Sequence, residues 1–100
     1  MAAKIIIKRR FIPGNRIEIL TLLNDMRTAA LDQPGYISGM TLSAHKDPQA
    51  LIVIGTWESI EHWHRWKDNE RRKELEALLE VYQELPTEYT DCIVGSGGLE

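Results

Sequence analysis

The sequence has little of what secretion, membrane insertion or nucleic-acid binding requires. Its single cysteine, Cys92, cannot form an internal disulfide, and no apolar run near the N-terminus has the length or flanks of a signal peptide or membrane span. The net charge of −3 is spread along the chain, without the concentrated positive patch that phosphate binding needs. We therefore expect a cytoplasmic protein that has neither nucleic acid nor a membrane as its partner.

The length of 100 residues is enough for one hydrophobic core and too short for two. We predict a single domain over residues 1–95. The remaining stretch, 96–100, is glycine-rich and without periodicity, and its final Leu99-Glu100 resembles a cloning remnant. We interpret it as a flexible tail outside the fold.

Apolar periodicity and turn residues divide the chain into strands and helices. Asn15 and Ser59 stand at helix N-cap positions, and Pro86 ends the last helix. Strands are expected at 4–12, 36–45, 51–57 and 87–95, and helices at 15–32, 59–68 and 71–85. The strands at 36–45 and 51–57 should pair as an antiparallel hairpin.

This order of elements is that of a ferredoxin-like, split βαβ domain of the α+β class. Such a domain has a four-stranded antiparallel sheet with helices on one face. The other sheet face stays uncovered, and so small a chain has no further element to cover it. We therefore expect a homodimer that packs sheet against sheet through this face.

Several short motifs resemble those of a known family. They are Pro13-Gly14, PGY at 34–36, GMTLSAH at 39–45, WES at 57–59 followed by Trp66, and TEYTD at 87–91. In this order they resemble the antibiotic biosynthesis monooxygenase superfamily over residues 4–94. The resemblance implies a dimeric α/β barrel built from two ferredoxin-like subunits. It also implies one of several activities, which include metal- and flavin-free oxidation of aromatic phenols and heme degradation.

The heme-degrading branch of the family can be compared position by position. It pairs an asparagine on the first strand, a tryptophan in the short helix and, ten residues later, a histidine that ligates iron. The matching positions here hold Ile7, Trp66 and Glu76, so heme degradation is disfavoured. Heme binding without degradation would need His62 or His64 as the ligand.

The oxygenase branch requires fewer specific residues, and the resemblance to it implies no cofactor. A bound phenol or hydroquinone loses a proton, and its anion can reduce dioxygen in a dry pocket. We predict a cofactor-independent monooxygenase that acts on a small phenol- or quinol-like aromatic molecule. The alternative is a non-catalytic small-molecule-binding or assembly module of the same fold.

The segment TWESIEHWHRWKDN, at 56–69, contains all three tryptophans and two of the three histidines. At about 100° per residue, Trp63 points to the core, while Trp66 and His62 lie one turn apart at its margin. His64 lies on the opposite flank, so the two histidines cannot share a metal ion, and we predict no metal site. We take Trp66 and His62 as candidate catalytic residues; the alternatives are core packing for Trp66 and a solvated surface position for His62.

Four residues are candidate substrate contacts. Trp63 is one of them, although core packing is the favoured explanation of its position. Arg9 shares a strand face with Ile7 and either meets an anionic ligand, pairs with a carboxylate of a neighbouring strand or lies at a solvated strand end. Tyr36 and Met40 share a face of their strand, and both line either the pocket or the dimer interface.

Overall fold

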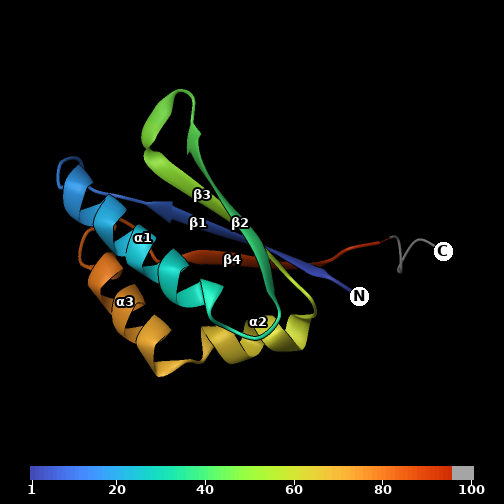
Figure 1. The fold of residues 1–100 in the computed structure, drawn as a ribbon. Helices are drawn as coiled ribbons and strands as arrows, with labels where there is room; N and C mark the ends of the chain where they lie inside the picture. The colour runs from blue at the N-terminus through green and yellow to red at the C-terminus, as the bar shows by residue number, and fades with distance from the viewer. Residues whose placement is uncertain (96–100) are drawn as a thin grey trace.

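The computed structural model describes residues 1–95, so the predicted tail at 96–100 lies outside the described residues. The elements are β1 (Ala3–Arg10), α1 (Arg16–Leu31), β2 (Tyr36–Ala44), β3 (Asp47–Trp57), α2 (Ile60–Lys67), α3 (Glu70–Glu80) and β4 (Glu88–Ile93). The strands form one antiparallel sheet in the order β2-β3-β1-β4, and the helices lie on one of its faces (Figure 1). The predicted ferredoxin-like α+β fold is confirmed.

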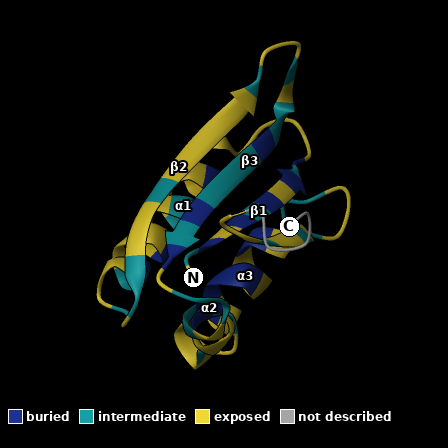
Figure 2. Ribbon diagram, turned by 90° about the vertical axis from the view of Figure 1, so that its right-hand side faces the viewer, coloured by how far each residue is buried: buried dark blue, intermediate teal, exposed yellow. Residues whose placement is uncertain are grey.

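Strand β1 lies between β3 and β4 and shows how the two sheet faces differ. Ile5, Ile7 and Arg9 are buried, whereas Lys4, just before Ile5, and Lys8, between Ile7 and Arg9, are exposed. The alternation predicted from the sequence is therefore present, with the buried residues under the helices. The opposite face carries half-buried and exposed residues along β3 and β2 (Figure 2).

The core lies between this sheet and the helices. Its largest fully buried side chains are Trp63 of α2, Ile5 of β1, and Leu75 and Leu79 of α3. Each aliphatic side chain of this kind stabilises the fold by roughly 1.5–3 kcal/mol when it leaves water. The core therefore fixes α2 and α3 against the middle of the sheet.

The last helix is shorter than predicted, because α3 ends at Glu80 and not near residue 85. After it the chain turns: the Tyr82 amide donates to Leu79, and the Tyr82 carbonyl accepts from the Ile12 amide. The following segment therefore pairs with the end of β1 instead of continuing the helix. Leu85, the last residue of the predicted helix, is 58% exposed.

The other boundaries need smaller corrections. Strand β3 begins at Asp47, so the β2–β3 hairpin is antiparallel as predicted but has a shorter turn. Ser59 caps α2 by accepting from the His62 amide at 3.3 Å, whereas Asn15 makes no side-chain cap and takes a left-handed φ of 57°. Within residues 1–95, no helix combines the length and the apolarity needed to cross a membrane.

Candidate active site

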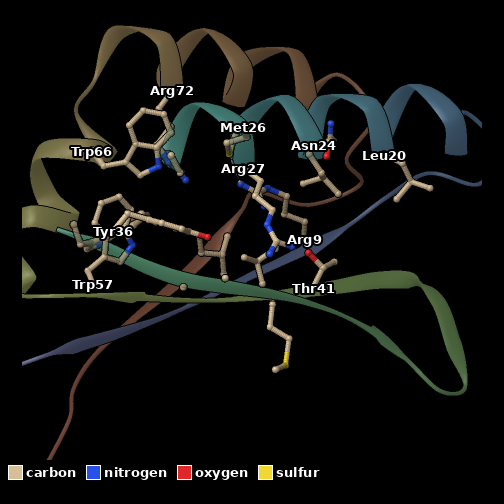
Figure 3. Close-up of a pocket in the computed structure, with 18 residues that line it drawn as sticks. Arg9, Leu20, Asn24, Met26, Arg27, Tyr36, Thr41, Trp57, Trp66 and Arg72 are labelled. Carbon is tan, nitrogen blue, oxygen red and sulfur yellow. Dashed lines mark hydrogen bonds between the residues drawn. The ribbon is translucent and has the colours of Figure 1, made fainter. Parts of the chain in front are cut away.

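A cavity of about 240 Å³ lies between α1, the sheet and the tryptophans of α2 (Figure 3). Strands β1, β2 and β3 form its floor, α1 forms one wall, and Trp63 and Trp66 with Arg72 of α3 close one end. This volume is slightly below the roughly 300 Å³ at which pockets for drug-sized ligands begin. The space therefore suits a molecule of one or two rings.

Two glycines keep the floor of this cavity open. Gly39 of β2 and Gly55 of β3 are directly paired, so no side chain stands on either at that point of the floor. A Cβ atom on Gly39 would lie 2.6 Å from the Tyr36 hydroxyl, which is too close for a normal contact. The Tyr36 hydroxyl therefore occupies the space that a side chain at residue 39 would take.

Aromatic side chains form one end of the cavity. The Tyr36 ring meets Trp57 edge-on at 5.2 Å, and Trp57 lies 6.1 Å from Trp63. Trp63 Nε1 donates to Asp91 Oδ1 at 3.2 Å, so its polar atom is already engaged. Core packing thus accounts for Trp63, although its ring also lines the cavity.

Trp66 and Tyr36 differ from Trp63 in their polar atoms. Both residues line the cavity (Figure 3). In the part of the chain that the structure describes, neither the Trp66 indole N–H nor the Tyr36 hydroxyl has a hydrogen-bond partner in the protein. The structure therefore brings together two polar groups that can bind a ligand; that they do so stays a prediction.

The expectation that Tyr36 and Met40 share a strand face is wrong, because β2 contains a bulge. Tyr36 pairs with Trp57, but Ser38 pairs with the next residue of β3, so the bulge reverses the alternation. Met40 pairs with Ile54 on the open face and is 57% exposed. Met40 borders the cavity through its position in β2, while its side chain lies on the other side of the sheet.

The two histidines of α2 point away from each other, as predicted, and neither lines the cavity. His62 Nδ1 is 2.7 Å from Ser59 Oγ, and a Cβ atom on Gly35 would come within 2.3 Å of the His62 ring. His64 Nε2 lies 3.2 Å from a carboxylate of β4. The structure therefore does not bring His62 together with Trp66 at the cavity. Among residues 1–95, no histidine lines the cavity as a possible heme ligand.

Arg9 lines the cavity and forms an ion pair, but its partner is on a helix and not on a neighbouring strand. Its Nη2 donates to Glu76 Oε1 of α3 at 2.6 Å. Glu76 also accepts hydrogen bonds from Thr87 Oγ1 at 2.7 Å and from the Tyr89 hydroxyl at 3.2 Å. Arg72 Nη2 lies 3.5 Å from the same carboxylate.

These contacts decide which groups of the cluster are ionised. Burial alone would raise the pKa of Glu76, but the hydrogen bond and charge of Arg9, with help from Thr87 and Arg72, bring it below its usual value. Burial raises the pKa of Tyr89, so its hydroxyl stays a neutral donor at neutral pH. Glu76, which stands where the heme-degrading branch has its histidine, is thus an ionised partner of arginine, and the residues present do not fit a heme site.

Several cavity residues were not predicted from the sequence. They are Asn24 and Arg27 of α1, Thr41 of β2 and Arg72 of α3. Asn24 and Arg27 follow Leu20 at helical spacing beside the apolar stripe of α1, which is the one signal that could have indicated them. Arg72 lies in the charged stretch NERRKELE, a pattern typical of a solvated helix face, yet it is buried.

Residues 3–85 match the family model described as antibiotic biosynthesis monooxygenase. The fold is similar to that of a conserved protein from Methanosarcina mazei Go1, with a TM-score of 0.85 and 19% identity over 91% of this chain and 90% of that chain. It is also similar to Rv0793 from Mycobacterium tuberculosis, with a TM-score of 0.84 and 14% identity over 96% and 97% of the two chains.

A third similar structure is SnoaB, a cofactor-independent oxygenase from Streptomyces nogalater. Its TM-score is 0.81 and its identity 13%, and the match covers 100% of each chain. No curated protein matches the sequence. At such low identities these structures support the fold alone. The family model, in contrast, matches most of the chain at the level of its sequence.

Proposed function

The chain belongs to the antibiotic biosynthesis monooxygenase family, and on this premise we propose that it oxygenates a small phenol- or hydroquinone-like aromatic without a metal or flavin. SnoaB, which has a similar fold, is itself a cofactor-independent oxygenase. The observation that carries the proposal is the aromatic cavity in which Trp66 and Tyr36 present unengaged polar groups. The cavity provides confinement, and the two groups provide hydrogen bonds to an oxygen anion.

The reaction can be written so that atoms and electrons balance. A bound hydroquinone loses a phenolic proton to water, and its anion passes one electron to dioxygen. The resulting radicals join through a new bond between a ring carbon and oxygen, which gives a peroxide. Loss of the ring hydrogen as a proton breaks the O–O bond, so one oxygen atom stays on the ring as a carbonyl and the other leaves as water. The substrate supplies all four electrons that dioxygen takes up.

In this scheme Trp66 and Tyr36 are the residues that contact the reacting atoms. The Trp66 N–H and the Tyr36 hydroxyl donate hydrogen bonds to the phenolate and then to the peroxide, whose charges they stabilise. Trp63 and Trp57 supply the apolar walls that keep water away from the anion. His62 has no part in the scheme because it lies outside the cavity.

Oxygen uptake with a panel of phenols and hydroquinones tests this function. We expect uptake above the protein-free rate with at least one of them, and a loss of roughly tenfold or more in Trp66→Phe, which removes only a hydrogen-bond donor and ring area. Tyr82→Phe is the matched control, since it also removes one polar group but lies outside the cavity. An equal loss in both variants would count against the role of Trp66.

A non-catalytic binding module is the second candidate function. It is favoured by one observation: among residues 1–95, no histidine or carboxylate lines the cavity to act as a base. If no compound of the panel raises oxygen uptake while some of them bind, the protein is a binder and the oxygenase proposal is wrong.

We also propose that the protein is a homodimer through the open face of its sheet. That face carries Met40, Leu42 and Ile54, and among residues 1–95 no helix covers it. Met40 and Leu42 are exposed, and burying such apolar side chains would stabilise the association. Light scattering should give twice the mass of the chain, and Ile54→Glu should give the mass of the monomer; a monomeric native protein would contradict the proposal.

A further inference from the structure

The charged residues that line the cavity are all of one sign. They are Arg9, Arg27 and Arg72, and no carboxylate of residues 1–95 accompanies them, although the chain as a whole has a net charge of −3. Figure 3 shows the three arginines coming from three different elements, β1, α1 and α3. The cavity is therefore more positive than the protein around it.

Within residues 1–95, the charges of the two buried arginines, Arg9 and Arg72, are only partly neutralised by the protein. Arg9 and Arg72 are 4% and 2% exposed, and both share the single carboxylate of Glu76. Two cations and one anion leave one positive charge in excess in a buried place, which is costly without a further partner. Asp91 does not line the cavity and is engaged by Trp63 and a histidine.

The arginines also have unused hydrogen-bond donors. Within the described residues, the hydrogen bonds of both guanidinium groups come from Nη2 alone, and Nε of each is buried without a partner. A guanidinium group presents adjacent N–H groups that match the two oxygens of a carboxylate. The Nε groups are too deeply buried for a ligand to reach, but Nη1 of each arginine also makes no hydrogen bond within residues 1–95 and is the donor open to such an acceptor.

We propose that the arginine wall, defined by Arg9 and Arg72, is a subsite for a carboxylate carried by the aromatic ligand, with Arg27 adding positive charge nearby. This inference deepens the proposed function, because it makes an aromatic acid the substrate class. The carboxylate neutralises the excess charge, and the ring extends toward Trp66 and Tyr36 at the same cavity. The protein thereby selects its ligand by charge as well as by shape.

Anaerobic calorimetric titration with two matched probes tests the subsite. 2,5-Dihydroxybenzoate carries the carboxylate, and 2,5-dihydroxybenzamide has the same shape without the charge. We expect the native protein to bind the acid roughly tenfold or more tightly than the amide, since charge-assisted hydrogen bonds are about twice as strong as neutral ones. Equal affinities, tighter binding of the amide or no binding of either probe would overturn the proposal.

Substitutions of single arginines show which of them causes the preference for the acid. Arg72→Gln should abolish most of the preference for the acid, because it leaves Arg9 and Glu76 as a neutral pair. Arg71→Gln removes the same charge from an exposed neighbouring position and should leave the preference intact. If Arg72→Gln does not fold, Arg27→Gln, an exposed residue at the same cavity, should still lower the preference. An unchanged preference in the variant that folds would contradict the subsite.

A phenolate could in principle use the same positive wall, and 4-nitrophenol separates the two cases. If the protein lowers the apparent pKa of 4-nitrophenol but does not prefer the acid over the amide, the wall serves phenolates and the carboxylate proposal is wrong. Oxygen uptake is a separate readout. If the protein prefers the acid but no oxygen is taken up, the oxygenase function is wrong and the carboxylate subsite is supported. If oxygen is taken up without a preference for the acid, the subsite is wrong and the oxygenase function is supported.

Discussion

Glu76→Gln tests the buried charge cluster, on which the electrostatics of the cavity depend. The substitution keeps the shape of the side chain and an acceptor for the Thr87 hydroxyl. It removes the one negative charge between Arg9 and Arg72, so that both guanidinium groups become buried cations without a counter-charge.

The expected loss of stability is large for a change of so few atoms. Removing one partner of a buried ion pair costs about 3–5 kcal/mol, and the remaining amide acceptor places Glu76→Gln near the lower limit, at about 3 kcal/mol. The Glu76 side chain is only 11% exposed, so solvent screens little of this effect. For comparison, the whole free energy of unfolding of such a domain is on the order of 5–15 kcal/mol.

Urea unfolding of the native and variant proteins measures this loss. Glu74→Gln is the matched control on the same helix, because its carboxylate pairs with Arg71 at 3.5 Å while 66% exposed. It should change the free energy of unfolding by less than about 0.5 kcal/mol. A loss of unfolding free energy below about 1 kcal/mol for Glu76→Gln would contradict this prediction, because the stability of the cluster would then not depend on the charge of its carboxylate.

The same carboxylate predicts how stability depends on pH. The folded-state pKa of Glu76 lies below its usual value of 4.5, so the unfolded chain binds the proton more readily. The contribution of the ionised Glu76 carboxylate to the free energy of unfolding is therefore complete above pH 4.5. It is lost as the pH falls through the folded-state pKa. Unfolding free energies measured on both sides of pH 4.5 should fall more steeply in acid for the native protein than for Glu76→Gln. Parallel curves would contradict this assignment.

Two glycine substitutions test the geometry around the cavity. Gly39→Ala puts a Cβ atom 2.6 Å from the Tyr36 hydroxyl, so we expect weaker binding of aromatic ligands in calorimetry, while Gly55→Ala, whose nearest contact would be 3.4 Å, should change it less. Gly35→Ala should lower stability by at least about 2 kcal/mol in thermal unfolding, since φ is +84° and the new Cβ atom would meet the His62 ring at 2.3 Å. An unaltered melting temperature for Gly35→Ala would show that His62 is placed differently.

Much of the fold could be predicted because local patterns and packing agree. Alternation in β1 predicted that Ile5, Ile7 and Arg9 share one face, and the helices do cover that face. Helical geometry likewise separated His62 from His64, whose contacts in the structure are different. These features depend on periodicity alone, which the sequence carries directly.

The site was harder to predict because it depends on irregular backbone and on distant partners. One extra residue in β2 reverses the alternation after Tyr36, and so Met40 leaves the face that the sequence pattern assigned to it. The partner of Arg9 is Glu76, which is 67 residues away in the chain. Neither a bulge nor a contact between distant segments leaves a periodic signal, so the structure was needed to find them.

We have proposed that the cavity beside Trp66 is where one oxygen atom of dioxygen is inserted into a small aromatic substrate. The most direct test is a reaction with isotopically labelled dioxygen, followed by mass spectrometry of the organic product. We expect one labelled oxygen atom in the product for each dioxygen consumed. The rate of product formation should fall in Trp66→Phe. A product without labelled oxygen, or consumption no faster than in the absence of protein, would contradict the proposal.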